Sequence, residues 1–131
     1  MKNKTKIKSI LLVEDDPFLS DIYLTKLKES GFEAVGVSEG KECLRIIKEK
    51  DFDLALLDIV LPRMDGWEIL RKIRETKKNA KIKNLKVVIL SNLGQKEDIE
   101  KGLKLGAVKY LIKAHYTPTE VVREIKKILK N

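Results

Sequence analysis

The sequence has few of the residues that build disulfide or zinc sites. Its 131 residues include one cysteine, Cys43, and one histidine, His115. A single cysteine excludes an intramolecular disulfide, and a single histidine excludes a cluster of histidine ligands around a metal. Such a chain suits a reducing compartment, so we expect a cytoplasmic location.

Long apolar runs are also absent. No stretch approaches the roughly 20 apolar residues that cross a bilayer, which argues against membrane insertion. The apolar stretch after the basic N-terminus is short and leads into three acids, so it is not a signal peptide. The length suits a single domain over 1–131, with a core of about 7–130.

Charge is unevenly distributed along the chain. Lysine and arginine total 28 against 20 acids, a net charge of +8. Residues 9–62 hold six basic and twelve acidic residues, whereas residues 63–86 hold nine basic and three acidic residues. Basic stretches can bind nucleic acid, anionic membranes or acidic partners, but scattered lysines are most often solvated. We therefore do not expect nucleic acid to be the main partner. Nucleic-acid binding through 63–86 remains an alternative, as a function added to the main one.

Short apolar segments alternate with longer amphipathic segments. The first kind predicts strands at 9–13, 33–37, 54–57, 87–90 and 109–112, and the second predicts helices at about 17–30, 39–50, 66–78, 95–105 and 118–130. Continuous apolarity is typical of strands that are covered on both faces. Five β–α repeats therefore predict an α/β fold, with a five-stranded parallel sheet and five helices on its two faces.

Residues at the ends of the helical segments support these boundaries. Asp16, Asp65 and Thr117 stand where helix N-caps are expected, and prolines follow the first and the third. Gly31 and Gly106 stand where helices are expected to end in a left-handed conformation.

Polar residues follow four of the predicted strands. They are Glu14, Asp15 and Asp16; Asp58; Ser91 and Asn92; and Lys113. Ligands of parallel α/β sheets bind at the carboxyl ends of the strands, so we expect these side chains to converge. Several carboxylates beside one lysine favour a hard divalent cation, and all-oxygen ligands suit Mg²⁺ or Mn²⁺ better than Zn²⁺.

Such a site suits phosphoryl transfer. A carboxylate can attack phosphorus to form an aspartyl phosphate, and the transfer then depends mainly on positioning and charge neutralisation. We expect Asp58 to be the nucleophile, Lys113 to neutralise one phosphoryl oxygen, and the Ser91 hydroxyl to donate a hydrogen bond to another.

Four motifs carry a resemblance to a known family. They are ILLVEDD (10–16), LLDIVLPRMDG (56–66), ILSN (89–92) and KYLIK (109–113). With these motifs the sequence resembles the receiver domains of response regulators in two-component signal transduction. The resemblance implies a flavodoxin-like three-layer sandwich with strand order 2-1-3-4-5. It also implies a switch in a histidine–aspartate phosphorelay, which is not an enzyme beyond its own phosphorylation and dephosphorylation.

The resemblance assigns a role to each site residue. Asp58 matches the phosphoacceptor and a metal ligand, Asp15 the direct metal ligand, and Glu14 an acid that reaches Mg²⁺ through water. The backbone carbonyl of Val60 matches a further ligand. These assignments imply a magnesium site, with Mn²⁺ as the other candidate ion.

The same resemblance implies how the signal leaves the site. Ser91 matches the switch hydroxyl, Lys113 the phosphate-binding lysine, and Tyr110 an aromatic switch that rotates when Ser91 moves towards the phosphoryl group. The output face then lies on 95–105, 109–112 and 118–130. Implied partners are a sensor histidine kinase or histidine phosphotransfer protein and a downstream protein, and the chain is expected to be a monomer or a phosphorylation-dependent dimer.

Two positions depart from the family pattern, and two others bear on hydrolysis of the aspartyl phosphate. Ala114 follows the lysine where the family usually has a cis proline, so we predict a trans bond and a shifted loop. Asn92 stands where a small residue is common. In the family, the positions of Val60 and Leu93 border the hydrolytic water; both residues are apolar, which predicts slow self-dephosphorylation.

Two other classes of protein share part of this chemistry or fold. A haloacid-dehalogenase-like phosphatase also uses an aspartate nucleophile with Mg²⁺, but it needs a second acid where Val60 stands, and it usually has a cap domain. A nucleotide or flavin binder would carry a glycine-rich phosphate loop, which this sequence lacks. A stand-alone switch and a receiver cut from a longer protein both remain open.

Overall fold

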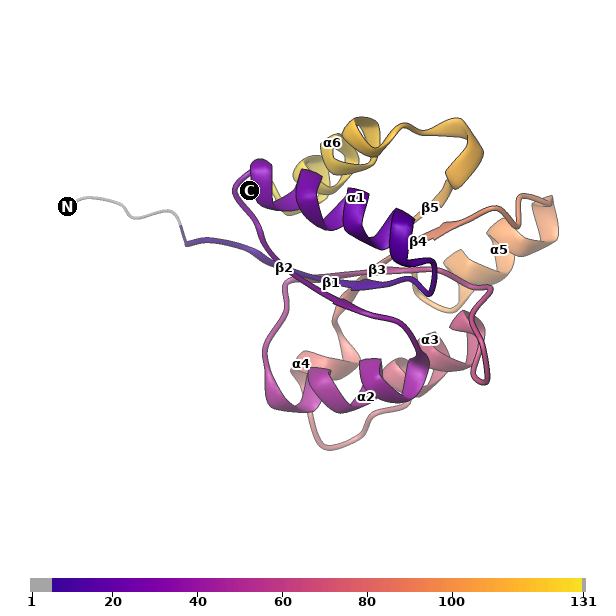
Figure 1. The fold of residues 1–131 in the computed structure, drawn as a ribbon. Coiled ribbons are helices and arrows are strands. Elements are labelled where there is room, and N and C mark those ends of the chain that lie inside the picture. Colours follow the sequence, from indigo (N-terminus) through magenta and orange to yellow (C-terminus); the bar gives the residue numbers. More distant parts are fainter. Residues whose placement is uncertain (1–5, 131) are drawn as a thin grey trace.

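The computed structural model describes residues 6–130, in which five parallel strands form one sheet in the order β2-β1-β3-β4-β5 (Figure 1). The strands are β1 (Ser9–Val13), β2 (Glu33–Val37), β3 (Leu54–Leu57), β4 (Lys86–Ser91) and β5 (Lys109–Ile112). The predicted α/β class and strand order are confirmed. Residues 1–5 and 131 of the expected 1–131 domain lie outside the described residues.

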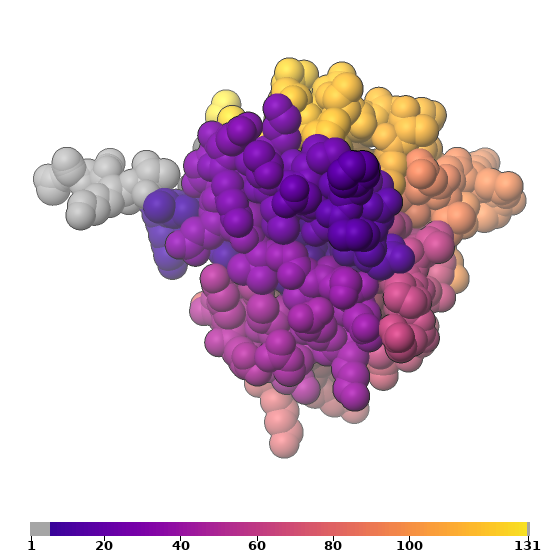
Figure 2. Space-filling view, in the orientation of Figure 1, coloured from indigo at the N-terminus to yellow at the C-terminus, as the bar shows by residue number. Residues whose placement is uncertain are grey.

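Helices cover both faces of this sheet. They are α1 (Pro17–Glu29), α2 (Gly40–Glu49), α3 (Gly66–Arg74), α4 (Ala80–Lys83), α5 (Lys96–Lys104) and α6 (Pro118–Leu129), with a 3₁₀ turn, η1 (Lys113–His115). Helices α1 and α6 lie on one face, and α2, α3 and α4 lie on the other (Figure 1). Figure 2 shows the side on which α1 lies between α6 above and α2 below. Among residues 6–130, no helix is long and apolar enough to cross a bilayer.

The inner strand β1 explains why strands covered on both faces are almost entirely apolar. Its five residues are all buried. Successive side chains point to opposite faces, so Ile10 and Leu12 join the core under α1 and α6, whereas Leu11 and Val13 join the core under α2 and α3. A strand between two helical layers therefore has no polar face, as the sequence pattern predicts.

The expected caps are present. The Asp16 carboxylate accepts the backbone N–H groups of the first turn of α1, and that of Asp65 accepts one in α3. Thr117 forms a full capping box at the start of α6. Gly31 and Gly106 have φ of 93° and 95°, the left-handed conformation expected at helix ends.

One helix boundary was predicted wrongly. The segment 66–78 was expected to be one helix, but α3 ends at Arg74 and a separate short helix, α4, follows. Ile73 is the last buried residue of α3, and the residues after it offer no apolar stripe to continue the packing. The Asn79 side chain then accepts the Ile82 N–H at 3.1 Å and caps the new helix.

Candidate functional site

The site lies where four neighbouring strands end. Glu14 follows β1, Asp58 follows β3, Ser91 closes β4 and Lys113 follows β5. Because β1, β3, β4 and β5 are consecutive in the sheet, their carboxyl ends bring these residues to one edge. Side-chain contacts show the expected convergence for Glu14, Asp58 and Lys113.

Lys113 is bound by two buried carboxylates. Its Nζ lies 2.7 Å from Glu14 Oε1 and 2.7 Å from Asp58 Oδ2. Glu14 and Asp58 are only 3% and 6% exposed. Burial lowers the pKa of Lys113, but the hydrogen bonds and charges of the two carboxylates outweigh it, so the pKa lies above its ordinary value. The ammonium group therefore stays charged and balances one of the two carboxylates.

The second oxygen of Asp58 is held by the backbone. Asp58 Oδ1 accepts the N–H of Ile59 at 2.7 Å and that of Val60 at 3.3 Å. The chain that follows passes very close to it, because a Cβ at Gly66 would lie 2.3 Å from the Asp58 carbonyl oxygen. Glycine at 66 thus allows the start of α3 to pack against the residue that carries the carboxylate.

Three carboxylates could share a cation. Glu14, Asp15 and Asp58 each offer one oxygen, and these oxygens all lie within 4.8 Å of one another. Asp15 is exposed, so the group opens to solvent on one side. An all-oxygen donor set with an open side fits a hard divalent cation that keeps several of its waters, as Mg²⁺ does. Val60, the expected source of a carbonyl ligand, is 61% exposed beside this group, and that role stays a prediction.

Ser91 and Tyr110 are linked to each other through a loop. The buried Ser91 Oγ accepts the Leu93 N–H at 3.2 Å, and the Tyr110 hydroxyl donates to the Leu93 carbonyl at 2.5 Å. The Tyr110 ring packs on α5, where a Cβ at Gly102 would lie 2.9 Å from it. Burial raises the pKa of Tyr110, which stays a neutral donor. Within residues 6–130, neither side chain is hydrogen-bonded to Asp58.

The bond after Lys113 is trans, as predicted, and the shift of the loop stays a prediction. Residues 6–130 contain no cis peptide bond, as predicted for the bond between Lys113 and Ala114. The chain turns at once into η1, and the Ala114 N–H donates to Asn92 Oδ1 at 3.1 Å. Both residues were singled out in the sequence, but nothing in it indicated that they bond to each other.

Tyr23 is a neighbour of the site that the sequence did not indicate. It lies on the apolar stripe of α1 and is 4% exposed, as a core residue would be. Burial raises the pKa of its hydroxyl, and the charges of Lys113 and the two buried acids also act on it. Its spacing along α1 is that of any core residue, so it carried no separate signal.

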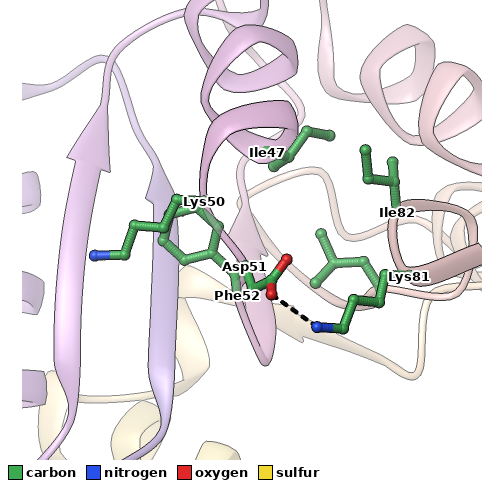
Figure 3. A pocket seen from close by; sticks show the side chains of 7 residues that line it. Ile47, Lys50, Asp51, Phe52, Lys81 and Ile82 are labelled. Carbon is green, nitrogen blue, oxygen red and sulfur yellow. Dashed lines mark hydrogen bonds and ion pairs between the residues drawn. The ribbon is translucent and has the colours of Figure 1, made fainter. Parts of the chain in front are cut away.

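Two of the hollows on the surface of residues 6–130 differ in what they can bind. An open groove of about 530 Å³ runs beside Glu14 and Asp15, and Phe18 at its rim is 82% exposed. The other, of about 20 Å³, lies at the amino end of β3 between α2 and α4 (Figure 3). Its walls include Ile47, Phe52 and Ile82, and it has room for little more than a water molecule. Of these two, the groove beside Glu14 and Asp15 has both the room and the charged groups to hold a ligand.

A parallel sheet of order 2-1-3-4-5 with a buried aspartate, a lysine and an acidic cluster at its carboxyl edge defines a class of signalling switch. The model of the response regulator receiver domain matches residues 10–126, and the chain belongs to this family. It is 33% identical over 125 residues to the alkaline phosphatase synthesis transcriptional regulatory protein PhoP of Bacillus subtilis, covering 94% of this chain and 49% of that protein. The chain thus spans about half the length of the curated relatives it matches.

Solved structures agree on the fold. A receiver domain protein of Methanospirillum hungatei, described as CheY-like, is 30% identical with a TM-score of 0.83, over 95% of this chain and 94% of that chain. The chemotaxis response regulator CheY4 of Vibrio cholerae has a TM-score of 0.85 over 95% of this chain and 100% of that chain. At 22% identity, this second likeness concerns the fold alone.

Proposed function

We propose that this receiver domain accepts a phosphoryl group on Asp58. The observation that carries the proposal is the pair of buried carboxylates, Glu14 and Asp58, held on one lysine at 2.7 Å. Two buried acids against one buried cation leave an excess of negative charge, which is costly unless a cation or a reaction relieves it. Functional sites retain such unbalanced groups more often than structural cores do.

The transfer would run as follows. A carboxylate oxygen of Asp58 attacks phosphorus of a phosphohistidine, and the phosphorus–nitrogen bond breaks with its electron pair left on the imidazole nitrogen. Lys113 then lies within reach of a phosphoryl oxygen, since its Nζ already contacts Asp58 Oδ2. The Ile59 and Val60 amides hold the other carboxylate oxygen and so orient the group for attack.

Mg²⁺ fits this proposal. Glu14, Asp15 and Asp58 would hold the ion, with the Val60 carbonyl as the further ligand that the sequence predicts. Bound there, it would neutralise phosphoryl oxygens as charge develops in the transition state. Mn²⁺ has the same oxygen preference and is expected to substitute for it.

We further propose that the phosphorylated state signals through α5, β5 and α6. Ser91 and Tyr110 support this assignment, because both bond to Leu93 at the start of the loop that leads into α5. Movement of the Ser91 hydroxyl towards a phosphoryl oxygen would alter the contact that Tyr110 makes. Leu103 and Val108, 48% and 45% exposed, offer apolar area for a downstream protein on this side.

A direct test uses acetyl phosphate as the small donor. The chain is incubated with and without Mg²⁺, and intact mass is compared with that of the isosteric variant Asp58→Asn. We expect one phosphoryl group on the wild type, dependent on Mg²⁺, and none on the variant. Labelling of Asp58→Asn at the wild-type level, or no labelling of the wild type, would overturn the proposal.

A further inference from the structure

One side-chain hydrogen bond joins the two loops that carry the phosphoryl-binding groups. Asn92 Oδ1 accepts the Ala114 N–H at 3.1 Å, across 22 residues of sequence. Asn92 directly follows Ser91, and Ala114 directly follows Lys113. The bond therefore links the backbone beside the hydroxyl to the backbone beside the lysine.

The N-cap residue of η1 cannot supply a hydrogen-bond acceptor to the first turn. The first N–H groups of a helical turn have no partner within it, and a side chain at the N-cap usually supplies one. Here the N-cap residue is Ile112, whose side chain has no polar atom and makes no cap bond. Asn92 supplies the missing oxygen from the neighbouring loop.

This bond holds the backbone from which the Lys113 side chain extends. The Lys113 side chain is 12% exposed and extends from η1 to reach two acids at 2.7 Å. A long lysine side chain has many rotamers, so the placement of its ammonium group depends on how firmly its backbone is held. Any shift of the 113–115 turn is passed on to the ammonium group.

We propose that Asn92 is a positioning residue for Lys113, a role that rests on the proposed function. It caps η1 from the adjacent loop and makes the Ser91 and Lys113 loops move together. When Ser91 approaches a phosphoryl oxygen, the Lys113 turn follows. Its side-chain oxygen is bonded to the Ala114 N–H, so the role assigned to it is exerted through the loop that it holds.

Two substitutions separate the hydrogen bond from the bulk of the side chain. Asn92→Leu keeps the branched shape of the side chain and removes the acceptor, whereas Asn92→Asp keeps an acceptor oxygen. We expect amide hydrogen exchange at Ala114, measured by NMR, to be roughly 3- to 10-fold faster in Asn92→Leu, the range that the loss of one exposed hydrogen bond gives. Asn92→Asp should retain the wild-type exchange rate.

The phosphorylation kinetics test the positioning role. In Asn92→Leu and in Asn92→Ala, the maximal rate with acetyl phosphate should fall roughly 3- to 10-fold, while the half-saturating concentration changes little. Asn84→Ala, an exposed asparagine at the opposite end of the sheet, serves as the control and should match the wild type. The urea midpoints of all variants should also stay close together.

The outcomes distinguish this inference from the proposed function. If the wild type is labelled at Asp58 but both Asn92 variants react at its rate or faster, the positioning role is wrong and the proposed function stands. If Ala114 exchange is unchanged in Asn92→Leu, the bond does not hold the turn, whatever the kinetics show. If the wild type takes no phosphoryl group, the proposed function fails and the positioning role fails with it.

Discussion

Each end of the sheet has a partly buried cationic side chain, Lys113 at the carboxyl end and Arg74 at the amino end, and the two bind different partners. At the carboxyl end, Lys113 contacts two carboxylates. At the amino end, the Arg74 guanidinium donates to the backbone carbonyls of Lys83, Leu85 and Gly106 at 2.7 to 2.9 Å. Carbonyl groups are neutral, so Arg74 ties three segments together without opposing charge. Lys113 instead sits in a group with an excess of acid, which is the end where we expect chemistry.

Distance alone does not reveal this difference. The pair of Lys81 and Asp51 at the amino end also measures 2.7 Å, and Figure 3 shows it at the edge of the small apolar hollow. Both of its side chains are 75% exposed, whereas that of Lys113 is 12% exposed. Water screens the pair of Lys81 and Asp51 much more than the contacts of Lys113. At the same distance, the electrostatic energy is therefore larger for Lys113.

Removing Lys113 should have the largest effect on stability. Lys113→Met keeps most of the side-chain volume but leaves two buried carboxylates without a cation, and we expect a loss of about 3 kcal/mol in metal-free buffer. Urea unfolding gives the value, and Mg²⁺ should restore part of it. Because folding raises the pKa of Lys113, its contribution is complete below its ordinary value and is lost as pH rises through the folded value.

Lys81→Met is the matched control for that variant. The same substitution in the exposed pair at the amino end should leave the unfolding midpoint almost unchanged. Equal losses in the two variants would mean that burial does not separate the two ends.

Two glycines differ between the two ends of the sheet in the space that a side chain would have. A Cβ at Gly66 would lie 2.3 Å from the Asp58 carbonyl oxygen, so Gly66→Ala must displace the backbone of the phosphoacceptor. We expect a loss of about 2–3 kcal/mol and slower phosphorylation. Gly31→Ala at the amino end meets no atom within 4 Å, and only its positive φ opposes the change, at about 1 kcal/mol. Its phosphorylation rate should equal that of the wild type, and a slower rate would contradict the separation of the two ends.

The fold was largely readable from the sequence, for a physical reason. Strands covered on both faces leave continuous apolar runs, and the bounds of β1 and β3 follow directly from them. The bounds of the edge strands β2 and β5 also match the prediction, although these strands are only partly buried. The short helix α4 was missed because four residues cannot show a helical period, and its cap, Asn79, looks like any loop asparagine.

The site was predicted less completely. Carboxylates and a lysine after neighbouring strands indicated that Glu14, Asp58 and Lys113 would meet, since parallel topology fixes where strands end. The bond of Asn92 to Ala114 depends on how two loops turn, and loop conformation leaves no periodic pattern in a sequence.

Arg74→Ala should destabilise the chain without touching the chemistry. Three carbonyls at the amino end lose their donor, and we expect a cost of about 2 kcal/mol in urea unfolding. Burial lowers the pKa of Arg74, but a guanidinium stays charged at neutral pH. The rate of phosphorylation by acetyl phosphate should not change, and a parallel loss of rate would show that the two ends are coupled.

The basic stretch should give the smallest effect. Lys77, Lys83 and Lys86 are exposed around α4, far along the sheet from the acidic edge. Replacing all three by glutamine should change the free energy of unfolding by less than about 0.5 kcal/mol per residue, because solvated lysines make few contacts.

Retention on duplex DNA over a salt series then decides whether this stretch is only solvated. If the wild type binds with a steep salt slope and the triple variant does not, the amino end is a polyanion-binding surface, since contacts to phosphates release counterions. If the wild type and the triple variant are retained alike, these three lysines do not bind nucleic acid.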